Sequence, residues 1–145
     1  MASLEEDYRA FRINAPEEIP FWVWLMENPD SPIPFPGQVS LKHHDLIHIL
    51  LGVGVTREEE ALVVGWTMGN DPKLQDWHIH LFLWVACTFY PDPYRFRRQD
   101  IPPFYQGLEW GRKCPYLKKI DTIKTAEKVR EEYGIPKNKE SLRQG

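Results

Sequence analysis

The stretch LKHHDLIHILLGVGVTREEEALVVGW, which runs from Leu41 to Trp66, contains two segments with helical spacing and a short glycine-containing turn between them. In the first segment, Ser40 is a candidate N-cap residue, and Gly52 directly follows the last apolar residue. Glycine is the commonest residue just past the end of a helix. These signals predict a helix over residues 41–51.

The second segment of this stretch begins with a capping-box pattern. Thr56 stands three residues before Glu59, so each side chain can bond the backbone N–H of the other residue at the start of a helix. We expect this helix to run to about Met68 and to end at Gly69 and Asn70. Because the turn is short, the two helices are expected to be antiparallel neighbours.

Helical signals recur along the rest of the chain, separated by prolines and glycines. Residues 29–39 are a proline-rich connector that cannot be helical, and residues 137–145 are a polar tail that we expect to fray. The run WHIHLFLWV alternates, which leaves a strand as the alternative to a helix there. The further helices are expected at residues 15–28, at residues 72–90, from Asp100 through FYQGLEWGRKC, and in TIKTAEKVREEYG. The expected fold is all-α, a single compact multi-helix domain over residues 1–145 with Pro/Gly-rich connectors.

The composition excludes several classes of protein. The chain has 145 residues, 42% hydrophobic content and a net charge of −3, which is typical of one globular domain. No run of basic residues indicates a nucleic-acid partner. The longest apolar runs fall short of the roughly 20 residues that a membrane-spanning helix needs, and the acidic segment after Met1 does not resemble a signal peptide. Cys87 and Cys114 form no paired motif, so we expect a cytoplasmic protein that could still lie on a membrane surface.

Three histidines and an aspartate interrupt the apolar pattern of residues 41–52. On a helix, His44 and His48 lie one turn apart on one face, Asp45 lies on the flank of that face, and His43 points elsewhere. Burial without partners would cost such polar groups several kcal/mol. Two histidines at this spacing on a helix suit two bonds to a metal ion. The alternative is a polar helix face on which Asp45 orients an imidazole.

Three consecutive glutamates begin the second helix, and one of them is a candidate metal ligand. Glu59 is accounted for by the capping box, and Glu58 is expected to face water. Glu60 shares the apolar stripe of its helix and can meet the histidine face if the two helices pack side by side. Two imidazoles and two carboxylates suit zinc first, then iron or manganese, and magnesium or calcium less well. The predicted metal ligands are His44, Asp45, His48 and Glu60.

Large aromatic side chains could line an apolar wall beside such a metal, although side chains of this type are more often core residues. His78 and His80 are two residues apart and cannot share a helix face, so we favour solvent or capping roles for them over a role next to the metal. The candidates for the apolar wall are Trp66, Trp77, Phe82, Trp84 and Phe89.

The segment HDLIH at residues 44–48, followed after eleven residues by Glu60, resembles the HDxxH-x11-E signature of the ubiquinone-biosynthesis family named for coenzyme Q protein four. The glycine soon after the second histidine and the segment EALVVGW are similar to that family as well. So are Gly111-Arg112 and the later segment VREEYGI. The resemblance covers roughly residues 41–136, and this chain would be a short, diverged member.

That resemblance implies an all-α fold and a divalent metal beside a pocket for a prenyl lipid. It further implies a place in quinone biosynthesis at a membrane, with a prenyl lipid or quinone precursor as the partner. The chemistry proposed for the family is oxidative decarboxylation of an aromatic head group. Whether this chain is an enzyme or a carrier, and whether it is a homo-oligomer, stays open. The residues implied as ligands are His44, Asp45, His48 and Glu60.

Two other classes of function compete with this interpretation. A phosphohydrolase of the HD type needs a histidine upstream of its HD pair, and no histidine precedes His43 in this chain. A non-catalytic helical interaction module would use the polar cluster only for structure. Such a module would bind no metal and would tolerate the substitution His48→Ala.

Overall fold

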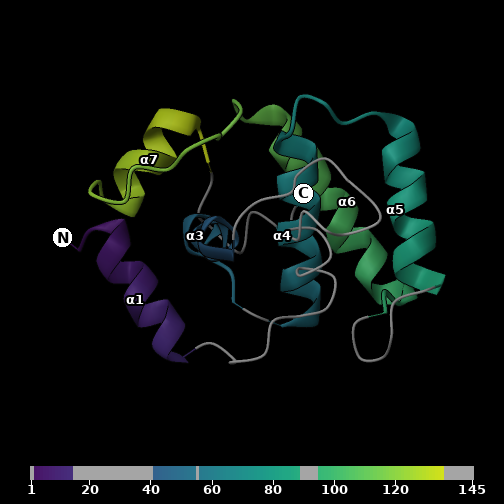
Figure 1. Ribbon diagram of the computed structural model, residues 1–145, viewed down its shortest axis with the longest axis horizontal. Helices are drawn as coiled ribbons and strands as arrows, with labels where there is room; N and C mark the ends of the chain where they lie inside the picture. Colours follow the sequence, from purple (N-terminus) through teal and green to yellow (C-terminus); the bar gives the residue numbers. More distant parts are fainter. Residues whose placement is uncertain (1, 15–40, 55, 89–94, 136–145) are drawn as a thin grey trace.

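The computed structural model describes residues 2–14, 41–54, 56–88 and 95–135. Every regular element within these residues is helical, which confirms the predicted all-α class (Figure 1). In this part of the chain, no helix is long and apolar enough to cross a membrane. The helix expected at residues 15–28, the connector at 29–39 and the tail at 137–145 lie outside the described residues. The elements are α1 (Leu4–Asn14), α3 (Leu41–Leu51), α4 (Arg57–Asn70), α5 (Asp76–Thr88), the 3-10 helix η1 (Arg98–Asp100), α6 (Ile101–Lys113) and α7 (Ala126–Tyr133).

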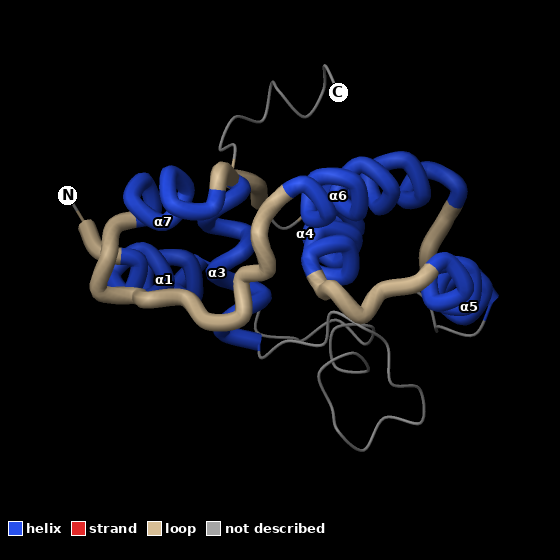
Figure 2. The backbone as a smooth tube through the Cα atoms, turned by 90° about the horizontal axis from the view of Figure 1, so that it is seen from above, coloured by secondary structure: helices blue, strands red, loops and turns tan. Residues whose placement is uncertain are grey.

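Helix α4 stands at the centre of the molecule and contributes to two hydrophobic cores. Figure 2 shows α1, α3 and α7 on one side of α4 and α6, and α5 on the other side. Leu62, Val63 and Trp66 of α4 pack into the core with α1, α3 and α7. Val64 and Met68 pack into the other core, which includes residues of α5 and α6. Residues 61–70 of α4 are all buried, so this helix has no solvent-facing side beyond its first turn.

Glycines bring the backbones of α4 and α6 into direct contact. Each helix carries two glycines one turn apart, and a Cβ atom added to any of the four would lie 2.0–2.1 Å from a carbonyl oxygen of the other helix. No side chain larger than hydrogen therefore fits at this crossing. Such close approach also allows Cα–H···O contacts between the helices. The pairs are Gly65 with Phe104, Gly69 with Leu108, Gly107 with Leu62, and Gly111 with Trp66.

Asn70, the last residue of α4, ties this helix to the end of α6. Its Nδ2 lies 3.1 Å from the carbonyl oxygen of Gly111 and 3.0 Å from that of Pro115, and its Oδ1 accepts from the backbone N–H of Leu117 at 2.8 Å. The carbonyl groups at the end of a helix lack intrahelical partners. The Asn70 amide supplies such a partner while it holds the following loop.

The expected boundaries of α4 and α5 needed correction. Helix α4 continues through Asn70, past the expected end near Met68, because Gly69 and Asn70 make the contacts with α6 just described. Helix α5 begins at Asp76 and not at Pro72. The imidazole Nδ1 of His78 accepts from the backbone N–H of Gln75 at 3.0 Å, which confirms a capping role for this histidine.

Helix α1 was not among the helices that the sequence analysis expected. Acidic residues occupy its first turn, where they favour the positive end of the helix dipole. Its start is held to the α7 side of the molecule, because the backbone N–H of Leu4 donates to the carbonyl oxygen of Lys124 at 2.8 Å. Lys42 of α3 pairs with Glu5 at 2.9 Å. These contacts hold α1 beside α3. The last turns of α1 therefore lie next to the predicted metal ligands.

The glycine contact makes a testable prediction for stability. We expect Gly107→Ala to lower the free energy of unfolding by about 3 kcal/mol or more, because its methyl group would meet the carbonyl oxygen of Leu62 at 2.0 Å. Chemical denaturation measures the change. The matched control on the same helix is Glu109→Ala, whose side chain is 72% exposed and whose loss should cost less than about 0.5 kcal/mol. Equal stability of the two variants would contradict the close packing of α4 and α6.

Candidate metal centre

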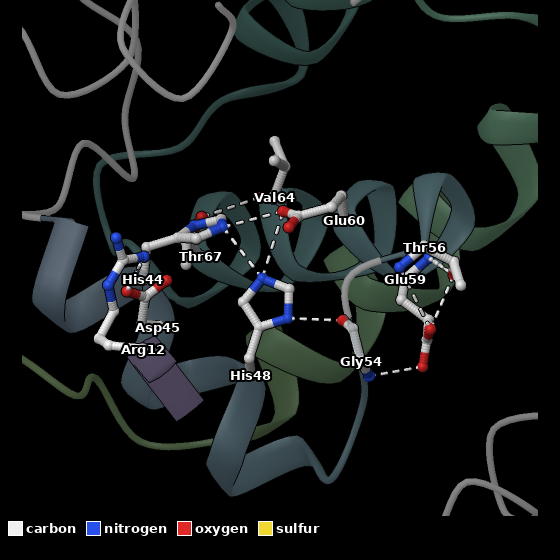
Figure 3. Close-up of polar contacts among 10 residues, drawn as sticks. All are labelled: Arg12, His44, Asp45, His48, Gly54, Thr56, Glu59, Glu60, Val64 and Thr67. Atoms are coloured by element: carbon white, nitrogen blue, oxygen red, sulfur yellow. Dashed lines mark hydrogen bonds and ion pairs between the residues drawn. The ribbon is translucent and has the colours of Figure 1, made fainter. Parts of the chain in front are cut away.

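His44 and His48 come from one face of α3, as their spacing predicted. Both imidazoles are buried, with His44 5% and His48 1% exposed. The ring of Phe11 from α1 lies 5.5 Å from the His48 ring between centroids. Buried imidazoles require polar partners, and Figure 3 shows both rings turned toward the same carboxylate.

That carboxylate belongs to Glu60, in the first turns of α4. Its Oε2 lies 3.1 Å from Nε2 of His44 and 3.2 Å from Nε2 of His48. The two Nε2 atoms lie 3.2 Å apart. Three donor atoms from two helices therefore form a nearly equilateral triangle. The prediction that Glu60 meets the histidine face is confirmed, and so is the capping box in which Glu59 takes part.

The turn between α3 and α4 holds the imidazole of His48 in one orientation. Nδ1 of His48 lies 2.8 Å from the carbonyl oxygen of Gly54. A carbonyl only accepts hydrogen bonds, so Nδ1 donates, and the neutral ring then presents an unprotonated Nε2 to the triangle. Glu59 secures the same turn, because its Oε2 accepts from the backbone N–H of Gly54 at 2.6 Å. A backbone carbonyl in this position is a common second partner of metal-binding histidines.

The triangle has dimensions that suit a metal ion. His44, His48 and Glu60 each offer one donor atom, and all three atoms lie within 4.8 Å of one another. Two ligands of a tetrahedral ion with bonds of about 2.0–2.1 Å lie about 3.3 Å apart, close to the observed separations. This buried group could hold a metal ion. Two imidazoles and one carboxylate are a donor set found in catalytic zinc sites and in non-haem iron sites.

The contacts within the triangle shift the pKa values of Glu60 and His48. Burial by itself would raise the pKa of Glu60, but hydrogen bonds from His44 and His48 outweigh it and lower the pKa to about 2. Burial would lower the pKa of His48, but the hydrogen bond and negative charge of Glu60 outweigh burial and raise it above 6.5. Glu60 is therefore held as a carboxylate, which is the form that binds a cation.

Asp45, the fourth predicted ligand, is not part of this triangle. Its carboxylate is 6% exposed, and its Oδ2 lies 3.2 Å from Nη1 of Arg12. Figure 3 shows Asp45 turned toward Arg12, while His44 turns toward Glu60. Burial is the main cause that raises the pKa of Asp45, and the charges of His44 and Arg12 partly offset it. The structure thus groups three of the four predicted ligands and gives the fourth an ion pair.

No protein-family model, curated protein or solved structure matches this chain. The resemblance to the ubiquinone-biosynthesis family therefore rests on the motif residues alone.

Two residues beside the site, Phe11 and Arg12, were missed by the sequence analysis. They lie more than thirty positions before His44 in the chain, in a helix that was not predicted. A signal existed, because Leu4, Tyr8 and Phe11 have the spacing of one helix face. Nothing in the sequence indicated which residue of the later helix Arg12 would pair with.

None of the other candidates that the structure describes belongs to the triangle. His43 is outside it, as expected, and burial together with the charge of His44 lowers the pKa of His43 to about 4. His80 is exposed. Trp66 and Phe82 are buried in the two cores, and Phe89 lies outside the described residues. Two further aromatic candidates are exposed and so line no buried wall in this structure, Trp77 by 59% and Trp84 by 57%.

The coupled protonation predicts how stability depends on pH in the metal-free protein. Because the pKa of Glu60 is lowered, its carboxylate stabilises the folded state above pH 4.5, and this stabilisation is lost as pH falls toward 2. Because the pKa of His48 is raised, its protonated imidazole stabilises the folded state below pH 6.5. This stabilisation is lost as pH rises through the pKa that His48 has in the folded protein. The wild type should therefore exceed Glu60→Gln in unfolding free energy by a few kcal/mol between about pH 4.5 and 6.5, and by less on either side.

Denaturation of chelator-treated protein from pH 3 to 9 measures this difference. Glu58→Gln is the control, because this exposed neighbour lies in the same turn of α4 and its removal should give a small difference across the whole range. A wild-type advantage over Glu60→Gln that stays constant with pH would contradict the coupling.

Proposed function

We propose that this protein binds one divalent metal ion through His44, His48 and Glu60 and uses it to bind an oxygen-bearing ligand. The convergence of three donor atoms, two from buried imidazoles and one from the partly buried Glu60, carries the proposal. Zinc is the metal we propose first. Iron and manganese fit the same donors, and magnesium fits them less well because it prefers oxygen ligands.

The likeness to the HDxxH-x11-E signature supports a prenylated aromatic quinone precursor as the ligand. Such a molecule presents a phenolate or carboxylate oxygen for a metal and an apolar chain for a groove or a membrane surface. We propose that the protein meets this lipid at a membrane, in a cytoplasmic setting. When bound, the metal would act as a Lewis acid toward the ligand's oxygen.

The residues of the chain would prepare the site for this role. Glu60 contributes the negative charge that a divalent ion requires, and its low pKa keeps that charge at every physiological pH. The hydrogen bond from His48 to Gly54 fixes the ring so that Nε2 faces the ion. Three protein ligands leave at least one further coordination position for a substrate oxygen or water, as in catalytic zinc sites.

One observation favours a second candidate, a helical module without metal. The Glu60 carboxylate accepts hydrogen bonds from two imidazoles when one of them is protonated, which satisfies the buried group without an ion. In that case the cluster would only join α3 to α4. Measured metal content separates the two candidates.

Elemental analysis by mass spectrometry is the first test. Purified wild-type protein should contain close to one equivalent of zinc, iron or manganese, and His44→Gln should lose most of it because one of three donor atoms is gone. The matched control is His43→Gln, which changes the adjacent histidine outside the triangle and should retain the metal. Wild type that stays metal-free after exposure to each of these divalent ions would support the module instead.

Metal affinity should fall as pH falls, because protons and the metal ion compete for the same imidazole nitrogen. A metal can bind His48 only when Nε2 carries no proton, and the pKa of this imidazole is raised above 6.5. Affinity should therefore begin to fall at a pH above 6.5 and decline further toward pH 5. Competition with a chromophoric chelator from pH 8 to pH 5 measures it. A flat profile would exclude histidine ligation.

A further inference from the structure

The Asp45 carboxylate stands next to the triangle but faces away from it. It follows His44 directly in α3, and it is only 6% exposed, so it is a buried carboxylate close to the metal donors. Carboxylates are good ligands for zinc, iron and manganese. In the structure, however, Asp45 Oδ2 lies 3.2 Å from Arg12 Nη1 and takes no part in the three-residue group. The partner of Asp45 in the structure is thus Arg12 and not the three-residue group.

We propose that Arg12 is a positioning residue that holds Asp45 out of the metal's coordination shell and so preserves an open coordination position. This inference rests on the proposed metal function. A divalent ion held by four protein ligands forms a closed site, whereas three protein ligands leave room for an exogenous molecule. Arg12 would thus decide between a structural and a reactive site without touching the metal.

The anchoring of α1 explains why Arg12 stays in place. The start of this helix is fixed by the backbone bond from Leu4 to Lys124 and by the pair between Glu5 and Lys42. Near its other end, the ring of Phe11 packs against the His48 ring. The guanidinium is therefore presented at the Asp45 carboxylate by a docked helix. A buried carboxylate is costly without a positive partner, so the pair is also held by the burial of Asp45.

The arrangement defines the charge of the ligand that the open position would take. A divalent ion with Glu60 as its single anionic ligand keeps a net positive charge. The Arg12–Asp45 pair adds no net charge beside it. An anionic donor is therefore favoured at the open position. If Asp45 joined the ion, that positive charge would be neutralised and the position closed.

Small anions that bind cobalt test this inference directly. Cobalt(II) replaces zinc in sites of this kind, and its visible spectrum changes when thiocyanate binds at an open position. Wild type loaded with cobalt should bind thiocyanate. Arg12→Gln should bind it at least about tenfold more weakly, because the released Asp45 takes the position. The double variant Arg12→Gln/Asp45→Asn should recover the wild-type affinity.

The matched control is Arg9→Gln, one turn earlier on α1, whose side chain is 74% exposed and whose loss should leave thiocyanate binding unchanged. A merely structural role for Arg12 would predict no recovery in the double variant. Arg12→Gln that binds cobalt and thiocyanate like wild type overturns this inference and leaves the metal function standing. Wild type that takes up no cobalt overturns both.

Asp45→Asn tests the same inference if Arg12→Gln does not fold. Because Asp45 is not a ligand in the proposed site, this variant should bind cobalt and thiocyanate with affinities within about threefold of wild type. A tenfold or greater loss of cobalt affinity would show that Asp45 is a ligand and would overturn the role of Arg12.

Discussion

The close contact between α4 and α6 is the constraint on which the rest of the structure depends. Four glycines let the two backbones touch, and any added Cβ would collide with a carbonyl oxygen across the crossing. This contact fixes the rotation of α4 about its own axis. With the glycine face committed to α6, the remaining faces of α4 must supply both hydrophobic cores. Glu60 stands five residues before Gly65, the first of these glycines, and therefore about 140° away from it around the helix. The same packing thus sets its direction away from α6 and toward α3.

The polar triangle between α3 and α4 follows from that placement and from the cost of burying charge. A carboxylate that is nearly enclosed requires a cation close by. In this site the cation is either a proton on an imidazole or a metal ion at the centre of the triangle. The same three atoms serve both states, because hydrogen bonds of about 3 Å and the edges of a metal coordination shell have similar lengths. The raised pKa at His48 and the lowered pKa at Glu60 reflect the hydrogen-bonded state without a metal.

Helix α1 connects the site to a distant part of the chain. It supplies no donor atom to the triangle, yet Phe11 covers the His48 ring and Arg12 neutralises Asp45. Because of this helix, two adjacent buried residues of α3 have different partners: His44 contacts Glu60 and Asp45 contacts Arg12. The sequence motif alone predicts both residues as metal ligands. The structure separates them through a partner more than thirty positions away in the sequence.

The sequence by itself determined whatever depends on near neighbours in the chain. The capping box of Thr56, the stop at Gly134 and the one-turn spacing of His44 and His48 are local, so helix type and the predicted metal-binding face could be read directly. It also indicated Glu60, because a short turn leaves little choice of partner face. Only the tertiary structure decided that the paired glycines of α4 and α6 face each other and that Asp45 forms an ion pair with Arg12. The reason is physical: contacts between elements distant in the chain depend on packing angles and rotations that no local spacing encodes.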